Sequence, residues 1–387
     1  MPQPITRRTL LGASIAALPL ARAVAAQSPS AASSQSTVQG LIVREQEPRN
    51  LESPASALRE LVTPTERFYV RSHFAVPTIE PAAYRLKIEG AVDRPVELSL
   101  DDLTRMPSRT QRSMLECAGN GRVFLVPKQP GAQWQIGAAG NADWTGVPLA
   151  DVLQRVGVKP GAVDVIFEGA DHGEITDDPK SPGDIHFVHS IPVSTAREGE
   201  VLLAYKMNGA DLTRSHGYPL RVVVPGWYGM ASVKWLRRLV ITDRPFDGFF
   251  QSLQYTRWER LDGTPTLTPV TEMHVKSVIV DPEIDGRVAA GRAYTVRGLA
   301  WTGRGTVTKV EVSTDDGKTW ADAQVTSPAA RGTWRSWEFV WRSPSAATQA
   351  LMSRATDSEG QQQPLTRDRD RRNYEITHVV ACPVSVR

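Results

Sequence analysis

The sequence changes character near residue 263, and this change constrains the fold more than any other feature. Upstream of it, short apolar strands alternate with short helical stretches. Residues 84–90 alternate with period two, and residues 149–156 fit a helix that ends at Gly157. After the Pro- and Thr-rich stretch 263–269, alternating strands separated by turns follow one another. The pattern predicts two domains, the first mixed α+β and the second all β.

Further elements are expected in both domains. The first domain is expected to contain another helix at residues 100–106. The additional strands are expected at 163–168, 220–224, 276–280, 293–300, 306–313 and 334–341. Asp315-Asp316-Gly317 lies between two alternating runs and predicts a hairpin turn. We therefore expect a mixed α/β domain over residues 58–262 and an antiparallel immunoglobulin-like β-sandwich over 263–387.

The N-terminus has the composition of an export signal. Residues 1–26 have a basic start, an apolar middle and small residues before the expected cleavage site. Pro19 and Arg22 break the apolar run, which is too short for a membrane span. Residues 6–11, Thr-Arg-Arg-Thr-Leu-Leu, resemble a twin-arginine signal, with a Sec signal as the alternative. We expect a folded chain in the periplasm with no membrane anchor after signal removal.

A flexible linker is expected to follow the signal, over residues 27–57. Residues 27–40 are rich in Ser, Ala and Gln and show no apolar period. The net charge of +3 comes from Arg7, Arg8 and Arg22 within the signal, so the expected mature chain is neutral. A neutral chain has no global basic field for nucleic acid or an anionic membrane, and we expect neither as a partner.

Cys117 is one of only two cysteines, and it lies in the glycine-containing stretch 113–122. It could form a disulfide with Cys382, because exported proteins often contain disulfides. It could be a nucleophile if one of several histidines were its base; the candidates are His172, His186, His189 and His216. It could also be a metal ligand. One thiolate is too few for zinc or an iron–sulfur cluster, but it suffices if a cofactor supplies the other ligands.

A series of ordered motifs resembles the sulfite oxidase family of molybdenum enzymes. The motifs are Phe68–His73, Glu116–Arg122, Phe167–Asp171, His216–Gly226, Ser232–Leu236 and Val310–Trp320. The resemblance covers nearly the whole chain from residue 58 onward. It implies an oxidoreductase with a molybdopterin-binding catalytic domain and a β-sandwich dimerisation domain. It also implies one molybdenum per chain, held by a pterin dithiolene and by Cys117, and no haem in this chain.

The resemblance also implies which residues bind the cofactor. His216, Arg221 and Lys234 match partners of the phosphate and the pterin, while Asp171 and His73 match hydrogen-bonding partners of the pterin. The remaining expected cofactor contacts are Tyr69, Arg71, Ser232 and Val233. Taken singly, a His or Arg beside Gly-Tyr-Pro could simply brace a turn.

The expected substrate site contains Arg71, Arg122, Tyr255 and Arg335. Because the chain is neutral, a small oxyanion needs local cations, and arginine suits this role. Arg335 matches the arginine that the dimerisation domain contributes in this family, although it could also be a surface strand residue. Trp134 is either a wall of the metal site or a core residue.

The resemblance implies oxidation of sulfite to sulfate by oxo transfer. Electrons would leave one at a time for an external acceptor, expected to be a cytochrome c. A homodimer through the C-terminal domain, or a heteromer with a cytochrome subunit, is expected. A related enzyme acting on sulfane sulfur, nitrate, a sulfoxide or another small oxyanion is the alternative. A non-enzymatic immunoglobulin-like binding protein is a remote alternative, because it leaves Cys117 and the other motifs unexplained.

Overall fold

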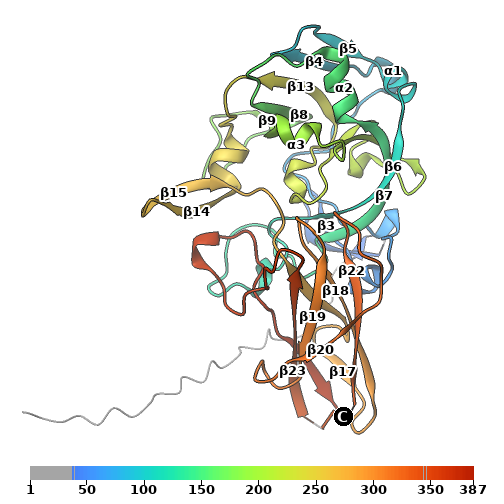
Figure 1. The fold of residues 1–387 in the computed structure, drawn as a ribbon, viewed down its shortest axis with the longest axis vertical. Coiled ribbons are helices and arrows are strands. Elements are labelled where there is room, and N and C mark those ends of the chain that lie inside the picture. Colours follow the sequence, from blue (N-terminus) through green and yellow to red (C-terminus); the bar gives the residue numbers. More distant parts are fainter. Residues whose placement is uncertain (1–36, 39, 343, 346) are drawn as a thin grey trace, which may run out of the picture. The chain divides into compact units, whose positions relative to one another are not determined.

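The computed structural model describes residues 37–38, 40–342, 344–345 and 347–387 (Figure 1). The expected export signal and the first part of the expected linker lie outside these residues. Within the described residues, no helix has the length and apolarity needed to cross a bilayer.

One mixed sheet of the N-terminal half has five strands, and α2 supplies much of the apolar packing nearby. In sheet order the strands are β5 (Val96–Leu98), β4 (Leu86–Gly90), β13 (Leu236–Thr242), β8 (Asp164–Gly173) and β9 (Ile185–Pro192). Only β4 and β13 pair in parallel. The helix α2 (Leu149–Val156) has the bounds predicted from the sequence, and it buries Leu149, Val152, Leu153 and Val156. This spacing places the four side chains on one face of a helix.

Two shorter helices complete the set of α-helices in the described residues, α1 (Leu100–Thr104) and α3 (Val193–Arg197). Ser99 starts α1 with a capping box, in which Ser99 Oγ accepts from the backbone N–H of Asp102 at 3.1 Å. The Asp102 carboxylate in turn accepts from the N–H of Ser99 at 2.9 Å. The helix is shorter than the predicted 100–106 because the chain turns at Arg105.

The second sheet of this half contains β6 (Arg109–Glu116), the strand that ends directly before Cys117. Its strands are β11 (Ala210–Asp211), β10 (Leu202–Met207), β7 (Ala139–Pro148) and β6, with β12 (Arg221–Val223) also paired to β10. The β6–β7 register runs from Arg109 opposite Gly146 to Glu116 opposite Ala139. Cys117 therefore follows directly on the last paired residue of β6, whose second half is buried.

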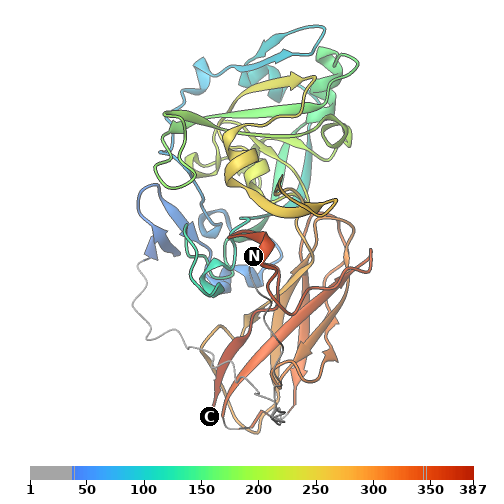
Figure 2. The same cartoon turned by 90° about the vertical axis from the view of Figure 1, so that its left-hand side faces the viewer.

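The C-terminal half is a sandwich of a four-stranded and a five-stranded sheet (Figure 2). The first contains β16 (Lys276–Asp281), β18 (Tyr294–Trp301), β22 (Arg335–Trp341) and β21 (Gln324–Val325). The second contains β17 (Gly286–Val288), β24 (Cys382–Val386), β23 (Ala347–Asp357), β19 (Val307–Ser313) and β20 (Ala321–Asp322). All neighbours pair antiparallel except β17 and β24. The predicted α+β and sandwich fold is confirmed, and the Asp315-Asp316-Gly317 turn joins β19 to β20.

The structure differs from the expected linker over residues 41–52, because they form strands. A small sheet contains β1 (Thr37–Val38), β2 (Leu41–Glu45) and β3 (Asn50–Glu52). Leu51 exchanges both backbone hydrogen bonds with Val70, at 2.9 and 2.8 Å, and Asn50 Oδ1 accepts from the N–H of Ser72 at 2.8 Å. The polar residues of this segment are thus ordered by partners in the Phe68–His73 motif, which local composition does not reveal.

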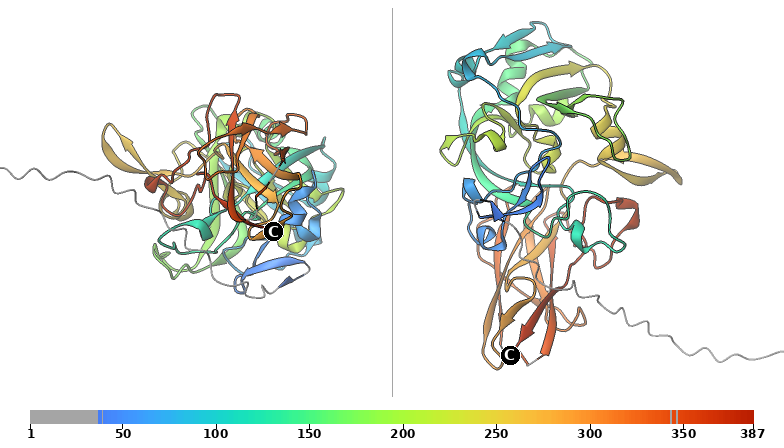
Figure 3. Two further views of the ribbon diagram at one scale, coloured as in Figure 1. Left: turned by 90° about the horizontal axis from the view of Figure 1, so that it is seen from below. Right: turned by 180° about the vertical axis from the view of Figure 1, so that it is seen from behind.

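A two-stranded hairpin, β14 (Thr256–Leu261) and β15 (Thr264–Pro269), extends away from the sheets (Figures 1 and 3). The expected domain boundary between residues 262 and 263 falls in its turn. A short π-helical segment, η7 (Phe250–Gln254), precedes the hairpin and leads into Tyr255.

The two halves share buried apolar and polar contacts. The largest cluster of buried apolar side chains includes Val278, Leu299 and Trp301 of the sandwich together with residues of both N-terminal sheets. Glu116 of β6 is almost fully buried, and its carboxylate accepts from Lys276 Nζ at 2.8 Å and Trp301 Nε1 at 2.8 Å. Asn120 Nδ2 donates a further hydrogen bond to it, at 3.0 Å.

We expect Lys276→Met to destabilise the protein by about 3–5 kcal/mol, because it leaves the Glu116 carboxylate buried without its cation. The double variant Lys276→Met/Glu116→Gln should recover part of this loss. Chemical denaturation measures both effects. The control is Lys309→Met, which removes a half-exposed lysine paired with Glu311 and should change stability little. An equal loss of stability in Lys276→Met and Lys309→Met would contradict the prediction.

Candidate functional site

An inner cavity collects most of the residues predicted for the cofactor. Loops and strand ends from both N-terminal sheets line it, and Cys117 lies on its wall. The predicted site residues on the wall are Tyr69, Arg71, His73, Cys117, Asp171, His216, Arg221, Ser232, Lys234 and Tyr255. Val233 is buried in the core instead, and only its neighbours Ser232 and Lys234 reach the cavity.

Cys117 is held by a tight turn at the end of β6. Its N–H donates to Ala138 O at 2.9 Å, and its carbonyl accepts from the N–H of Asn120 at 2.8 Å. At Gly119 a Cβ would lie 2.2 Å from Arg122 Nη2, so the Arg122 guanidinium can occupy its position only if residue 119 has no side chain. Gly121 has φ +99°, a conformation that favours glycine. The glycines of the motif therefore allow Cys117 and Arg122 to lie within one compact turn.

Both cysteines are free, so the disulfide interpretation of Cys117 is wrong. Cys382 is buried in β24, where its Sγ lies 3.6 Å from Pro282 O. Burial raises the pKa of the Cys382 thiol to about 12. Cys382 is thus a core thiol of the sandwich, whereas Cys117 lines the inner cavity.

Arg221 and Lys234 place two basic groups on the wall of the inner cavity, and Asp171 supplies one carboxyl group near Lys234. Arg221 donates to the carbonyls of His216 and Ser232, each at 3.0 Å. Lys234 Nζ donates to Ser72 Oγ at 3.1 Å and Ser215 O at 2.9 Å. Burial, aided by the charge of Arg221, lowers the pKa of Lys234 to about 7, and burial lowers that of Arg221 to about 10. These cations would be stabilised by an anionic ligand.

His216 and Asp171 each have a buried polar atom that lacks a partner among the described residues, His216 Nε2 and Asp171 Oδ1. The other ring nitrogen of His216 contacts Thr213 Oγ1 at 2.7 Å. Burial lowers the pKa of His216 to about 3, so the ring is neutral, and burial raises the pKa of Asp171 to about 7. Because buried polar atoms are normally hydrogen-bonded, both atoms indicate a polar ligand in the cavity. A ligand with a phosphate and a hydrogen-bonding ring system fits this set of groups.

An outer cavity of about 210 Å³ adjoins the inner one and shares Arg71, Cys117 and Tyr255 with it. Arg122 and Arg372 add further guanidinium groups to its lining. One water needs roughly 10–15 Å³ of such space, so a small oxyanion and its remaining hydration fit. Asp177 and Asp178 also line this cavity, but the three arginines outnumber them and favour an anion beside Cys117.

Hydrogen bonds and ring contacts hold the groups of the outer cavity in place. Arg122 Nη1 donates to Ala132 O at 2.9 Å, its Nε donates to Asn373 O at 3.2 Å, and its guanidinium lies over the ring of Tyr374. The hydroxyl of Tyr255 lies 2.6 Å from His73 Nε2. Burial holds the pKa of Tyr255 well above its ordinary value, so the hydroxyl stays protonated and can donate to an anion.

The structure does not bring Arg335 to either cavity, in contrast to the prediction. Its guanidinium lies in the sandwich, where it donates to Ser327 O at 2.7 and 3.1 Å and to Val307 O at 2.8 Å. The C-terminal half contributes Arg372 and Tyr374 to the outer cavity instead. Sequence reasoning missed these two residues, although the arginine-rich run 367–372 was a signal. Trp134 lines neither cavity and is a fully buried core residue.

Comparison with known families and proteins agrees with this geometry. Residues 73–250 match the oxidoreductase molybdopterin binding domain, and residues 268–373 match the Mo-co oxidoreductase dimerisation domain. The sulfite oxidase of Gallus gallus is 36% identical over 345 residues, which cover 84% of this chain and 73% of that protein. The sulfite oxidase of Arabidopsis thaliana is 36% identical over 301 residues, which cover 74% of this chain and 76% of that protein. The chain spans a smaller share, 62%, of the mitochondrial sulfite oxidase of Homo sapiens.

One solved structure is also similar along most of the chain. It is the sulfane dehydrogenase SoxCD from Paracoccus pantotrophus, with 31% identity and a TM-score of 0.74. The match covers 86% of this chain and 83% of that one. The resemblance read from the sequence motifs is therefore confirmed. The chain belongs to the sulfite oxidase family, as a molybdopterin-dependent oxidoreductase with the family's dimerisation domain.

Proposed function

We propose that this enzyme oxidises sulfite to sulfate, with its molybdenum cofactor in the inner cavity and the substrate anion in the outer cavity. The observation that carries the proposal is the position of Cys117. Its side chain lines both cavities, so a metal bound by its thiolate would face the arginine cluster. Similarity to sulfite oxidases along most of the chain supports the choice of substrate.

The residues of the inner cavity have chemistry suited to the cofactor. When bound, molybdopterin with its metal supplies the redox centre and the oxygen-atom transfer. We assign the metal-ligand role to Cys117, because a thiolate is a soft donor. Arg221 and Lys234 would neutralise the phosphate, and neutral His216 would supply its unpartnered Nε2 as a hydrogen-bonding group. Asp171 would accept hydrogen bonds from ring amino groups. Tyr69, Arg71, His73 and Ser232 would complete the surroundings of the cofactor, whereas the buried Val233 side chain lies outside them.

The residues of the outer cavity would bind and orient the oxyanion. Arg71, Arg122 and Arg372 can each donate charge-assisted hydrogen bonds, which are stronger than neutral ones. Tyr255 adds a protonated hydroxyl on the side of His73. Donors that are already fixed can stabilise charge that develops on the substrate oxygens without reorganising. Arg335 is not part of this proposed set, because it lines neither cavity and its guanidinium donates within the sandwich.

We further propose that electrons leave one at a time to an external cytochrome c in the periplasm. The N-terminal export pattern supports this compartment. A homodimer through the sandwich, or a heteromer with a cytochrome subunit, is consistent with the match to a dimerisation domain. The division of the chain at residues 262/263 into a cofactor domain and a dimerisation domain remains a prediction.

The substrate is tested with cofactor-loaded protein and a cytochrome c as acceptor. Sulfite is expected to reduce the cytochrome, whereas nitrate as an alternative acceptor should not be consumed. A sulfane-sulfur donor such as a persulfide serves as the competing substrate, because the SoxCD similarity favours that class as the second candidate. Molybdenum-containing protein that ignores sulfite and oxidises the persulfide would replace the proposed substrate.

We expect Cys117→Ser to abolish sulfite turnover with the fold retained, because a serine hydroxyl is a poor replacement for a thiolate ligand. Steady-state kinetics and circular dichroism measure the two properties. Cys382→Ser is the matched control, since Cys382 is a core thiol in the sandwich, and it should keep sulfite turnover. Wild-type turnover in Cys117→Ser would refute the ligand assignment.

Arg372→Met is expected to lower kcat/KM for sulfite by about tenfold to a hundredfold. This range corresponds to the roughly 1.5–3 kcal/mol of one hydrogen bond to a charged group. Arg335→Met is the matched control, because Arg335 comes from the same half of the chain but donates only within the sandwich. Its kcat/KM should stay close to that of the wild type. If Arg335→Met lowers kcat/KM for sulfite more than Arg372→Met does, Arg335 would be the substrate-binding arginine instead.

A further inference from the structure

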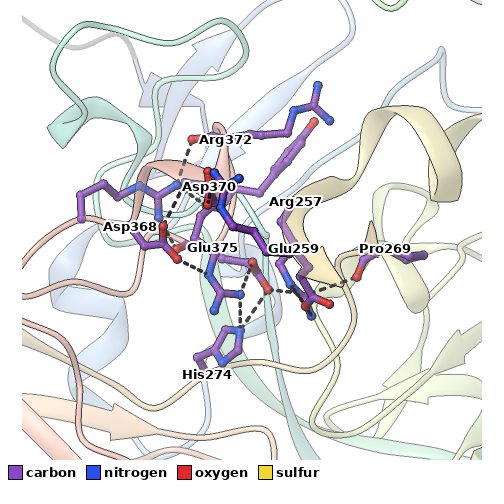
Figure 4. A network of polar contacts seen from close by, with 12 residues as sticks. Arg257, Glu259, Pro269, His274, Asp368, Asp370, Arg372 and Glu375 are labelled. Carbon is purple, nitrogen blue, oxygen red and sulfur yellow. Dashed lines mark hydrogen bonds and ion pairs between the residues drawn. The ribbon is translucent and has the colours of Figure 1, made fainter. Parts of the chain in front are cut away.

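A buried carboxylate, Glu375, lies behind the outer cavity at the centre of a polar network (Figure 4). Its side chain is fully buried. One oxygen accepts from Arg257 Nη1 at 3.3 Å and contacts His274 Nε2 at 3.1 Å. The other accepts from Arg371 Nη1 at 2.8 Å. Glu375 and its near neighbour Arg371 therefore meet Arg257 and His274, which lie about 100 residues or more earlier in the chain.

The network continues outward through acidic partners of the two arginines. Arg257 also pairs with Glu259 and donates to Pro269 O at 3.1 Å, so it spans β14 and β15. Arg371 pairs with Asp368 at 3.3 Å and lies 3.1 Å from His274 Nε2. Burial alone would raise the pKa of Glu375, but the hydrogen bond from His274 and the charges of Arg371 and Arg257 lower it overall. Glu375 is thus an ionised carboxylate that balances buried positive charge.

The backbone of Glu375 is tied to the turn that carries Cys117. Its N–H donates to Ala118 O at 2.8 Å, and its carbonyl accepts from Arg367 Nη1 at 2.5 Å. Its φ is +49°, a conformation that is unfavourable for most residues other than glycine. The surrounding contacts must hold the residue in this conformation, so the segment is fixed relative to Cys117.

Both segments held by Glu375 also carry groups of the outer cavity. Tyr255 lies two residues before Arg257, while Arg372 and Tyr374 lie three residues and one residue before Glu375. The rings of Tyr255 and Tyr374 are in contact, with centroids 4.8 Å apart. The position of one buried carboxylate therefore affects groups on two sides of the cavity.

We propose that Glu375 is a positioning residue of the anion site. By holding Arg257 and Arg371, it fixes Tyr255, Arg372 and Tyr374 at the spacing in which they contact a small oxyanion. Without its charge, the two arginines repel each other and both segments lose their common anchor. A displacement of such groups by about 1 Å can lower the rate substantially. This proposal rests on the proposed role of the outer cavity.

The test is Glu375→Gln in the cofactor-loaded full-length chain, with inorganic sulfate as the probe. Calorimetry is expected to show an increase of about tenfold in the sulfate Kd. For sulfite, KM should rise more than kcat falls, at unchanged molybdenum content. Glu311→Gln is the matched control, because Glu311 is a buried carboxylate of β19 that pairs with Arg354 at 2.9 Å and Lys309 at 3.0 Å. Its sulfate Kd should equal that of the wild type.

Wild-type sulfate affinity in Glu375→Gln, or equal loss in both variants, would overturn the proposal. If Glu375→Gln does not fold, Arg257→Lys replaces it, because lysine keeps the charge but not the geometry of the guanidinium. That variant should weaken sulfate binding in the same direction, and unchanged affinity would overturn the proposal as well. Glu375→Asp, which restores the charge, should bind sulfate more tightly than Glu375→Gln. Sulfate binding needs no turnover, so a wild-type protein that binds sulfate but ignores sulfite would refute only the proposed substrate.

Discussion

The buried ion pair between Glu116 and Lys276 is the interaction on which the rest of the structure depends. Glu116 directly precedes Cys117, and its carboxylate is enclosed by Lys276, Trp301 and Asn120. A carboxylate buried without a cation would be strongly unfavourable, so β6 can end as it does only when the sandwich is in place. The C-terminal half is therefore part of the structure that sets the position of Cys117, and its role extends beyond a surface for assembly.

The inner cavity has the opposite electrostatic problem, because positive charge there exceeds negative charge. Arg221 and Lys234 are buried and donate mainly to carbonyls and a hydroxyl, and His216 is neutral. Burying such charges lowers the stability of the folded protein, and a ligand with a phosphate would offset that loss. The protein without its cofactor is therefore less stable than it would be with neutral residues in the cavity, but its site is already arranged to bind the cofactor.

Sequence periodicity was sufficient to predict α2, the β19–β20 hairpin and the sandwich, because these elements depend on local pattern. The motifs were sufficient to identify most residues on the inner cavity wall. Arg335 was misplaced for a physical reason. An arginine between tryptophans on a strand and an arginine in an irregular segment carry the same charge, and only the path of the chain decides which one reaches the cavity. The strands β2 and β3 and the contacts of Glu116 and Glu375 likewise depend on partners far away in sequence.

The contacts of Glu116 and Glu375 have a consequence for how such chains can be recombined. Each carboxylate has its partners distributed across the conventional boundary between the two halves. A sandwich exchanged between relatives at that boundary would bring foreign partners to both carboxylates, even if its own fold were intact. The unit that can be transferred is therefore the sandwich together with the residues around both carboxylates, so that the structural module is larger than either sequence domain.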